Sequence, residues 1–164
     1  MSCARAHAHR AQRSSRSIAV RVSSLGACLV ALLGAPPAWC GWQTFGLADG
    51  LAALRVTAIA QDLDENLWFA STHGVSRYDG AFFRSFGQAD GLASDDVRAV
   101  LPDRSGRIWF ATAQGVSRYD RGTWTTFGVG EGLVSSDVRA ILEDRAGRFW
   151  FATGDFGVSR YDGE

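Results

Sequence analysis

Lysine is absent from this sequence of 164 residues, in which all 17 basic residues are arginines. This absence excludes a Schiff-base mechanism and lysine as a general base. Histidine is rare as well, because only His73 lies beyond residue 40. One turn histidine cannot supply a nucleophilic triad or a multi-histidine metal site. We therefore predict that the protein is not an enzyme and that it has no catalytic residues, no metal site and no cofactor.

Cysteine is equally scarce. The three cysteines, Cys3, Cys28 and Cys40, all lie in the first 40 residues. The sequence around Cys28 and Cys40 fits a lipoprotein cleavage site poorly, so we do not expect lipidation. Beyond residue 40 we expect neither an internal disulfide nor a cysteine metal cluster.

The first 40 residues have the composition of a targeting segment. They carry five arginines and no acidic residue, and residues 25–35 form an apolar run. Such a run suits the core of a signal peptide and is too short to span a bilayer. We predict a signal peptide over residues 1–40 and a periplasmic or secreted location. The alternative is an uncleaved basic tail.

Basic charge is in deficit over the rest of the chain. Twelve arginines stand there against 17 acids, so the net charge is −5. A protein that binds nucleic acid presents a basic patch that neutralises phosphates. We therefore predict no nucleic-acid partner.

A threefold internal repeat dominates these remaining residues. The hexapeptide Gly-Val-Ser-Arg-Tyr-Asp occurs at Gly74–Asp79, Gly115–Asp120 and Gly157–Asp162. A Trp-Phe-Ala tripeptide precedes each copy, and the tryptophans recur every 41 residues. The third copy contains one extra residue, at Asp155-Phe156. Self-similarity at such a period is typical of a repeat architecture.

Each repeat reads as four short strands separated by turns. In the second repeat the expected strands at residues 97–101, 107–112, 116–119 and 124–127 are separated by turn segments that contain Asp or Gly. Short strands at this spacing predict an all-β antiparallel meander, and a four-stranded meander every ~40 residues predicts a β-propeller blade. Because neighbouring blades cover both faces of each blade, consecutive residues such as Ile108, Trp109 and Phe110 can all be apolar.

We therefore predict about three blades in an incomplete ring. They span residues 55–86, 96–127 and 137–164, and residues 42–45 form a separate outer strand. Propellers usually have four to eight blades, and three alone would expose apolar faces. Two explanations remain open. The chain is a segment of a longer propeller, or copies of it complete the ring as a homo-oligomer, for example two chains with six blades.

The charged residues at the start of the inner strands are the strongest candidate site. Arg98 and Arg139 begin the second and third inner strands, and Asp96 and Asp137 stand two residues before them. Propellers usually bind ligands at the rim of the central channel, where loops vary on a rigid scaffold. We predict a ligand-binding site there. The alternative is a solvated cluster of charges that pair with one another.

Two turn residues extend this candidate site. His73 and Gln114 occupy matching turns of the first and second repeats, and both are included as ligand-binding candidates. The alternative for His73 is an ordinary solvated turn histidine.

Two further patterns have structural explanations. Arg77, Arg118 and Arg160 could form a ring for an anion, but each has an aspartate two residues later that can fix a turn. The segment 62–66 resembles the start of a calcium-binding loop but lacks its glycine and its final glutamate, so we predict a turn.

At these motifs the chain resembles the two-component regulator propeller repeat. Its inner strand, Asp-x-x-Gly turn, Trp-Phe strand and Gly-Leu-Ser-Arg-Tyr-Asp motif match this sequence at residues 97–120 and 138–162. The resemblance covers residue 42 onward. It implies the periplasmic sensor region of a hybrid histidine kinase or a diguanylate cyclase, with a small ligand such as a carbohydrate fragment.

The chain departs from that family in two respects. It has about three repeats instead of a ring of seven, and it contains no membrane helix, kinase or cyclase motif. We therefore predict a non-catalytic ligand-sensing segment of a truncated or split two-component sensor, completed by further blades and signalling domains. The alternatives are a secreted lectin-like module that forms a ring from copies and, less favoured, a propeller lyase.

Overall fold

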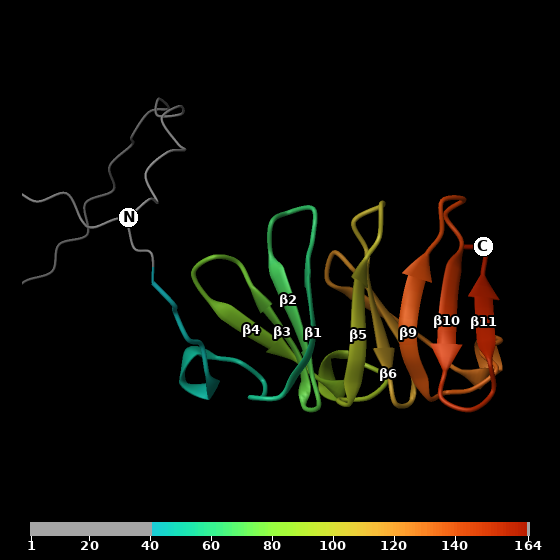
Figure 1. Ribbon diagram of the computed structural model, residues 1–164, viewed down its shortest axis with the longest axis horizontal. Helices are drawn as coiled ribbons and strands as arrows, with labels where there is room; N and C mark the ends of the chain where they lie inside the picture. Colours follow the sequence, from blue (N-terminus) through green and yellow to red (C-terminus); the bar gives the residue numbers. More distant parts are fainter. Residues whose placement is uncertain (1–40, 164) are drawn as a thin grey trace, which may run out of the picture. The chain divides into compact units, whose positions relative to one another are not determined.

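The computed structural model describes residues 41–163. The predicted signal peptide lies outside the described residues. Three antiparallel sheets stand side by side (Figure 1). The first contains β1 (Val56–Gln61), β2 (Leu67–Ser71), β3 (Gly74–Tyr78) and β4 (Phe83–Phe86). The second contains β5 (Val97–Pro102), β6 (Ile108–Thr112), β7 (Gly115–Asp120) and β8 (Thr123–Phe127). The third contains β9 (Val138–Glu143), β10 (Phe149–Thr153) and β11 (Val158–Tyr161).

The sheets are propeller blades built as up-and-down meanders. Each strand pairs with the next along the chain, and β5 contacts both β1 and β9, so the first strands of the three blades are neighbours. The prediction of an all-β fold with about three blades is confirmed. Within residues 41–163 the blades do not close into a ring.

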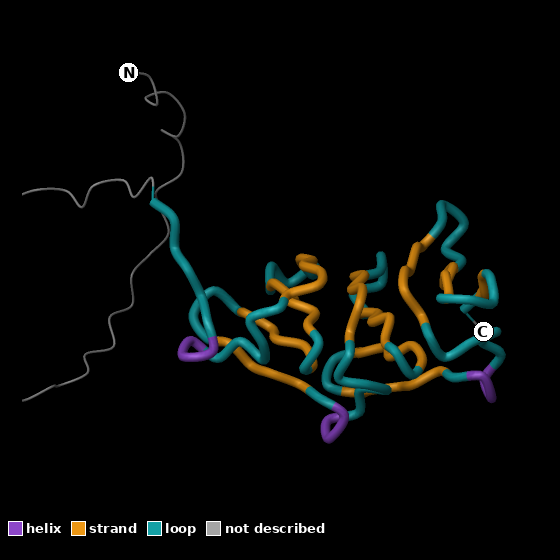
Figure 2. Tube along the Cα trace, turned by 60° about the horizontal axis from the view of Figure 1, so that its bottom comes forward, coloured by secondary structure: helices purple, strands orange, loops and turns teal. Residues whose placement is uncertain are grey.

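Three single-turn 3-10 helices lie in the loops that lead into the blades. They are η1 (Leu47–Asp49), η2 (Gln88–Asp90) and η3 (Val129–Glu131), and Figure 2 shows all three along the same side. The last residue of each helix is acidic, and its carboxylate accepts a hydrogen bond from the N–H of the glycine that precedes the helix. The recurrent acid-Gly-Leu motif therefore forms a closed turn. No helix of the described residues is both long and apolar enough to cross a bilayer.

Each of these loops is bonded to the blade that follows it. The hydroxyl of Ser117 in β7 accepts a hydrogen bond from the Ala93 N–H at 2.8 Å. Ser76 and Ser159 make the equivalent bonds in the first and third blades. The serine of the repeated hexapeptide thus holds the entering loop on its own blade, which explains why it recurs.

The core lies between the blades. Trp68 packs on Phe86 and Phe110, and Trp109 packs on Phe127 and Phe149, with ring centroids 4.4–5.8 Å apart. Both tryptophans are buried. The second blade lies between the first and the third and so has a neighbour on each face. All five residues of its strand β6 are therefore buried. This confirms the physical reason for the consecutive apolar residues of that strand.

The predicted outer strand at residues 42–45 is not formed. No residue of this segment is in a strand, and Trp42 is fully exposed. A strand needs a hydrogen-bonded neighbour, and none of the described strands pairs with this segment. Phe45 nevertheless packs on Tyr78 and Phe83 of the first blade, with ring centroids 5.5 and 5.4 Å away.

Candidate functional site

A β-bulge near the start of each inner strand shapes the rim. The pairing of β5 with β6 skips Arg98, and the pairings of β1 and β9 skip Thr57 and Arg139. A bulge leaves one residue outside the ladder and turns its side chain in a new direction. At the first bulge the Thr57 hydroxyl donates a hydrogen bond to the Val97 carbonyl of the next inner strand, at 2.6 Å.

At the second bulge the Arg98 guanidinium reaches the third blade. It is in direct contact with the Asp137 carboxylate and lies 3.4 Å from Asp96 of its own blade. The Arg139 guanidinium contacts the other oxygen of Asp137, at 3.1 Å. The structure thus brings four predicted site residues together in one chain of ion pairs, Asp96–Arg98–Asp137–Arg139, which we call the rim network.

The electrostatics of the rim network are balanced. Hydrogen bonds from Arg139, and then from Arg98, lower the pKa of Asp137. Two carboxylates and two guanidiniums give a net charge of zero. The side chains remain partly in solvent, with about 27% of the Arg98 side chain and 60% of the Arg139 side chain exposed. The network therefore offers oriented donors and acceptors to solvent without presenting an excess charge.

The two turn residues, His73 and Gln114, do not join this network. His73 lies in the turn between β2 and β3, and its Nδ1 is 3.1 Å from the Thr72 hydroxyl. It lines an open hollow of about 440 Å³ together with Gln88 and Asp95. Gln114 lies exposed in the matching turn of the second blade. Both turns are at the same end of the blades as the rim network, because Gly74 and Gly115 donate their N–H groups to Asp95 and Ser136 in the loops before β5 and β9.

Phe156 is a rim residue that sequence reasoning did not select. It belongs to the turn between β10 and β11 and is 68% exposed. The turn is bonded to the rim network, since the Gly154 N–H donates to the Asp137 carbonyl at 2.8 Å. The extra residue of the third repeat, which falls at this turn, was the signal that could have identified it.

Two of the three arginines of the repeated hexapeptide, Arg118 and Arg160, have structural roles. The Arg118 guanidinium stacks between the rings of Trp109 and Phe127, 5.6 and 5.5 Å from their centroids. Arg160 pairs with Asp162 at 3.0 Å, as the turn interpretation predicts. Both contacts are made within the blades, so these side chains are engaged in packing and turn formation.

The acidic segment after β1 is a turn, as predicted. The Asp62 carboxylate accepts hydrogen bonds from the Asn66 N–H and from the Trp68 indole, at 2.8 and 2.7 Å. Its oxygens are thus occupied by the fold. Over residues 41–163 no three His, Cys, Asp or Glu side chains are gathered as metal ligands would be.

Comparison with known protein families supports the interpretation of the repeat as a propeller repeat. The profile of the family described as "Two component regulator propeller" matches residues 91–114 and 132–155. No curated protein matches the sequence significantly. The resemblance inferred from the motifs is therefore confirmed by the family profile.

Solved structures give the same result. The extracellular domain of the hybrid two-component system BT3049 of B. thetaiotaomicron is 28% identical, with a TM-score of 0.67 over 73% of this chain. The extracellular domain of BT4673 from the same organism is 19% identical, with a TM-score of 0.62 over 76% of this chain. The matches cover 17% and 19% of those two extracellular domains, so this chain spans less than a fifth of their length.

A streptogramin B lyase also matches. It is 20% identical over 69% of this chain and 42% of the lyase, with a TM-score of 0.50. At this level of identity the likeness concerns the fold alone.

Proposed function

Because this chain carries two-component regulator propeller repeats in a segment similar to extracellular sensor domains, we propose that it is a non-catalytic ligand-binding segment of a two-component-type sensor. It acts in the periplasm or outside the cell, and its ligand binds at the rim network. The observation that carries this proposal is the Arg98–Asp137 contact between the second and third blades. A ligand bound there would touch both blades and would therefore favour one arrangement of the pair over another.

The chemistry of the rim favours a neutral, hydroxyl-rich ligand such as a carbohydrate fragment. Each guanidinium of the rim network is already paired with a carboxylate. The site therefore has no excess positive charge to attract an anion. Sugar hydroxyls both donate and accept hydrogen bonds, and they can use paired charges of both signs. The exposed ring of Phe156 on the adjoining turn adds an apolar surface.

Binding is tested by calorimetric titration of the full chain with cellobiose, maltose and digalacturonic acid. We expect a neutral disaccharide to bind and the acidic one not to bind. The Arg98→Gln and Arg139→Gln double variant should weaken that binding at least tenfold, because each lost bond to a charged group is worth about 1.5–3 kcal/mol. Arg104→Gln is the matched control, since Arg104 pairs with Glu143 beside the turn between β5 and β6.

Two results would contradict the proposal. One is tighter binding of digalacturonic acid than of either neutral sugar. The other is an equal loss of affinity in the Arg104→Gln control, which would place the ligand elsewhere or reflect a general loss of structure.

A further inference from the structure

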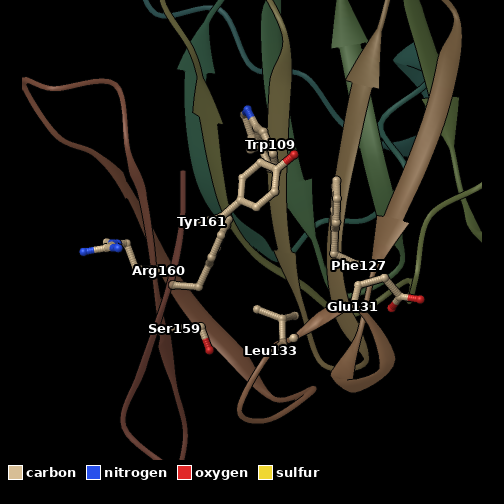
Figure 3. A pocket seen from close by; sticks show the side chains of 9 residues that line it. Trp109, Phe127, Glu131, Leu133, Ser159, Arg160 and Tyr161 are labelled. Carbon is tan, nitrogen blue, oxygen red and sulfur yellow. The ribbon is translucent and has the colours of Figure 1, made fainter. Parts of the chain in front are cut away.

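A small apolar pocket lies on the outer part of the third blade, facing the second. Figure 3 shows Tyr161, Phe127 and Leu133 around it, with Trp109 behind. Phe151, Gly132 and Glu131 also line the pocket, and Arg160 and Ser159 flank it on β11. We call this pocket the aromatic socket.

The first two blades have the same socket, and in them an aromatic ring fills it. In the second blade the filling residue is Trp124, the second residue of β8. Its ring lies 4.9 Å from Tyr119, 5.5 Å from Phe110 and 5.7 Å from Phe86. Tyr161, Phe151 and Phe127 are the repeat equivalents of these three residues in the third blade.

Phe83 fills the socket of the first blade. Its ring lies 4.6 Å from Tyr78, 5.8 Å from Phe69 and 5.4 Å from Phe45. The same three positions of the repeat therefore surround an aromatic ring in both four-stranded blades.

The space beside the glycine of the acid-Gly-Leu motif shows independently whether a side chain fills the aromatic socket. A Cβ added to Gly50 would lie 2.9 Å from the Cβ of Phe83, and one added to Gly91 would lie 2.6 Å from the Cβ of Trp124. A Cβ added to Gly132 would meet no atom within 4 Å. All three glycines have similar positive φ angles. The aromatic socket therefore has the same construction in each blade and is unfilled in the third.

A strand that carries such a ring could also pair with the free edge of β11. The third sheet has the order β11-β10-β9, so the far edge of β11 pairs with no described strand. Val158 of β11 is 58% exposed, whereas the equivalent Val75 and Val116 are fully buried under β4 and β8. An open strand edge is a template for pairing with another extended segment.

Residues 42–45 of the same chain have the matching sequence. They read Trp-Gln-Thr-Phe, and residues 124–127 of β8 read Trp-Thr-Thr-Phe. Trp42 is fully exposed and the segment forms no strand. Phe45 already packs on Tyr78 and Phe83, as Phe86 packs on Tyr119 and Trp124. The segment is thus positioned as the fourth strand of a blade that would precede the first.

We propose that residues 42–45 of a second copy of this chain add to β11 and insert Trp42 into the aromatic socket. The register follows from β7 and β8, in which Val116 opposes Phe127 and Tyr119 opposes Trp124. Phe45 of the second copy then opposes Val158, and Trp42 opposes Tyr161. This interface does not depend on the proposed ligand.

The interface is head-to-tail and can close. It places the first blade of one copy beside the third blade of another, as the first and second blades lie beside each other within one chain. A head-to-tail contact produces a ring when the rotation closes. Two copies give six blades, which is within the usual range of four to eight.

The first test is the solution mass of the full chain by light scattering over a range of concentrations. We expect the wild type to reach twice the chain mass and Trp42→Ala to have the mass of a single chain. Phe82→Ala is the control, because Phe82 is also an exposed aromatic residue but lies in the turn before β4. A wild type that stays at the mass of one chain, or a Trp42→Ala variant that keeps the doubled mass, would overturn the proposal.

The second test probes the register and does not require removal of Trp42. In a chain with Cys3, Cys28 and Cys40 changed to Ser, Gln43→Cys combined with Arg160→Cys places two thiols on directly opposed residues. Directly opposed Cα atoms are ~4.5–5.5 Å apart, which a disulfide can bridge. We expect a reducible dimer with this pair and none with Gln43→Cys combined with Arg104→Cys. Absence of the first dimer, or equal yields from both pairs, would overturn the proposed strand addition.

Discussion

The indole N–H of Trp109 donates a hydrogen bond to Oδ2 of Asp103 at 2.9 Å, and both residues are almost completely buried. The Asp103 carboxylate also accepts hydrogen bonds from the backbone N–H groups of Ser105 and Arg107 and from the side chain of Arg107. One carboxylate therefore closes the turn after β5 and fixes a buried tryptophan ring in the core between blades. Trp68 with Asp62 and Trp150 with Asp144 repeat this arrangement at 2.7 and 3.0 Å.

Asp103→Asn should lower the free energy of unfolding by about 1–3 kcal/mol, because it weakens charge-assisted bonds to buried donors. Urea denaturation followed by tryptophan fluorescence measures the loss. Asp120→Asn is the control, since Asp120 is exposed at the end of β7. Equal effects of the two changes would show that the buried carboxylate has no special role.

Acid should remove the advantage that Asp103 provides. Burial raises the pKa of this carboxyl, but the hydrogen bonds from Trp109 and Arg107 outweigh burial and lower the pKa below its ordinary value. A lowered pKa in the folded state contributes stability above the unfolded pKa, and this contribution is lost as the pH falls through the folded pKa. Melting temperatures of the wild type and Asp103→Asn should therefore converge below about pH 4. A gap that widens in acid would contradict this assignment.

Gly91→Ala should destabilise the chain more than Gly132→Ala. Both residues have positive φ, so each alanine carries a strain of roughly 1–2 kcal/mol. Only the Cβ at residue 91 also meets a side chain, that of Trp124, which adds about 1–3 kcal/mol of overpacking. Denaturation in the Trp42→Ala background compares the two without any contribution from dimers. Equal losses would mean that the loop moves freely away from β8.

Glu65→Gly should stabilise the protein by roughly 1 kcal/mol, because Glu65 has a left-handed backbone conformation at φ 67°. The equivalent residues of the other two repeats, Gly106 and Gly147, are glycines with φ of 83° and 79°. A rise in melting temperature measures the gain. Asp64→Gly is the control and should not stabilise, since Asp64 does not have a positive φ.

The blades could be predicted from the sequence because their information is local and repeated. A turn such as Asp103–Gly106 and a strand such as Ile108–Thr112 are specified by adjacent residues, and three copies in phase remove the ambiguity of one. The failure at residues 42–45 has the opposite cause. Their sequence matches a strand, but a strand also requires a partner in space, which a sequence pattern does not supply.

The candidate site was predictable to the level of the rim and no further. The sequence places Arg98 and Asp137 at matching ends of successive repeats. It does not show that Arg98 is left outside the ladder, because a bulge depends on the pairing of β5 with β6. The contact between these two side chains across the blades therefore required the three-dimensional arrangement.

The hydrogen bonds between neighbouring blades have a consequence for how such chains change in length. Thr57 bonds to Val97, Arg98 to Asp137 and Arg104 to Arg145, at separations of 40, 39 and 41 residues. Each partner is thus one repeat away, and neighbouring blades offer equivalent loops, inner strands and socket positions to one another. In-frame duplication or deletion of one 41-residue unit would keep the strands and socket positions of neighbouring blades in phase, whereas the side chains that meet across a boundary would depend on which repeats become neighbours. Recombination within the gene can therefore alter the number of blades in a single step while each remaining blade keeps a neighbour of the same design.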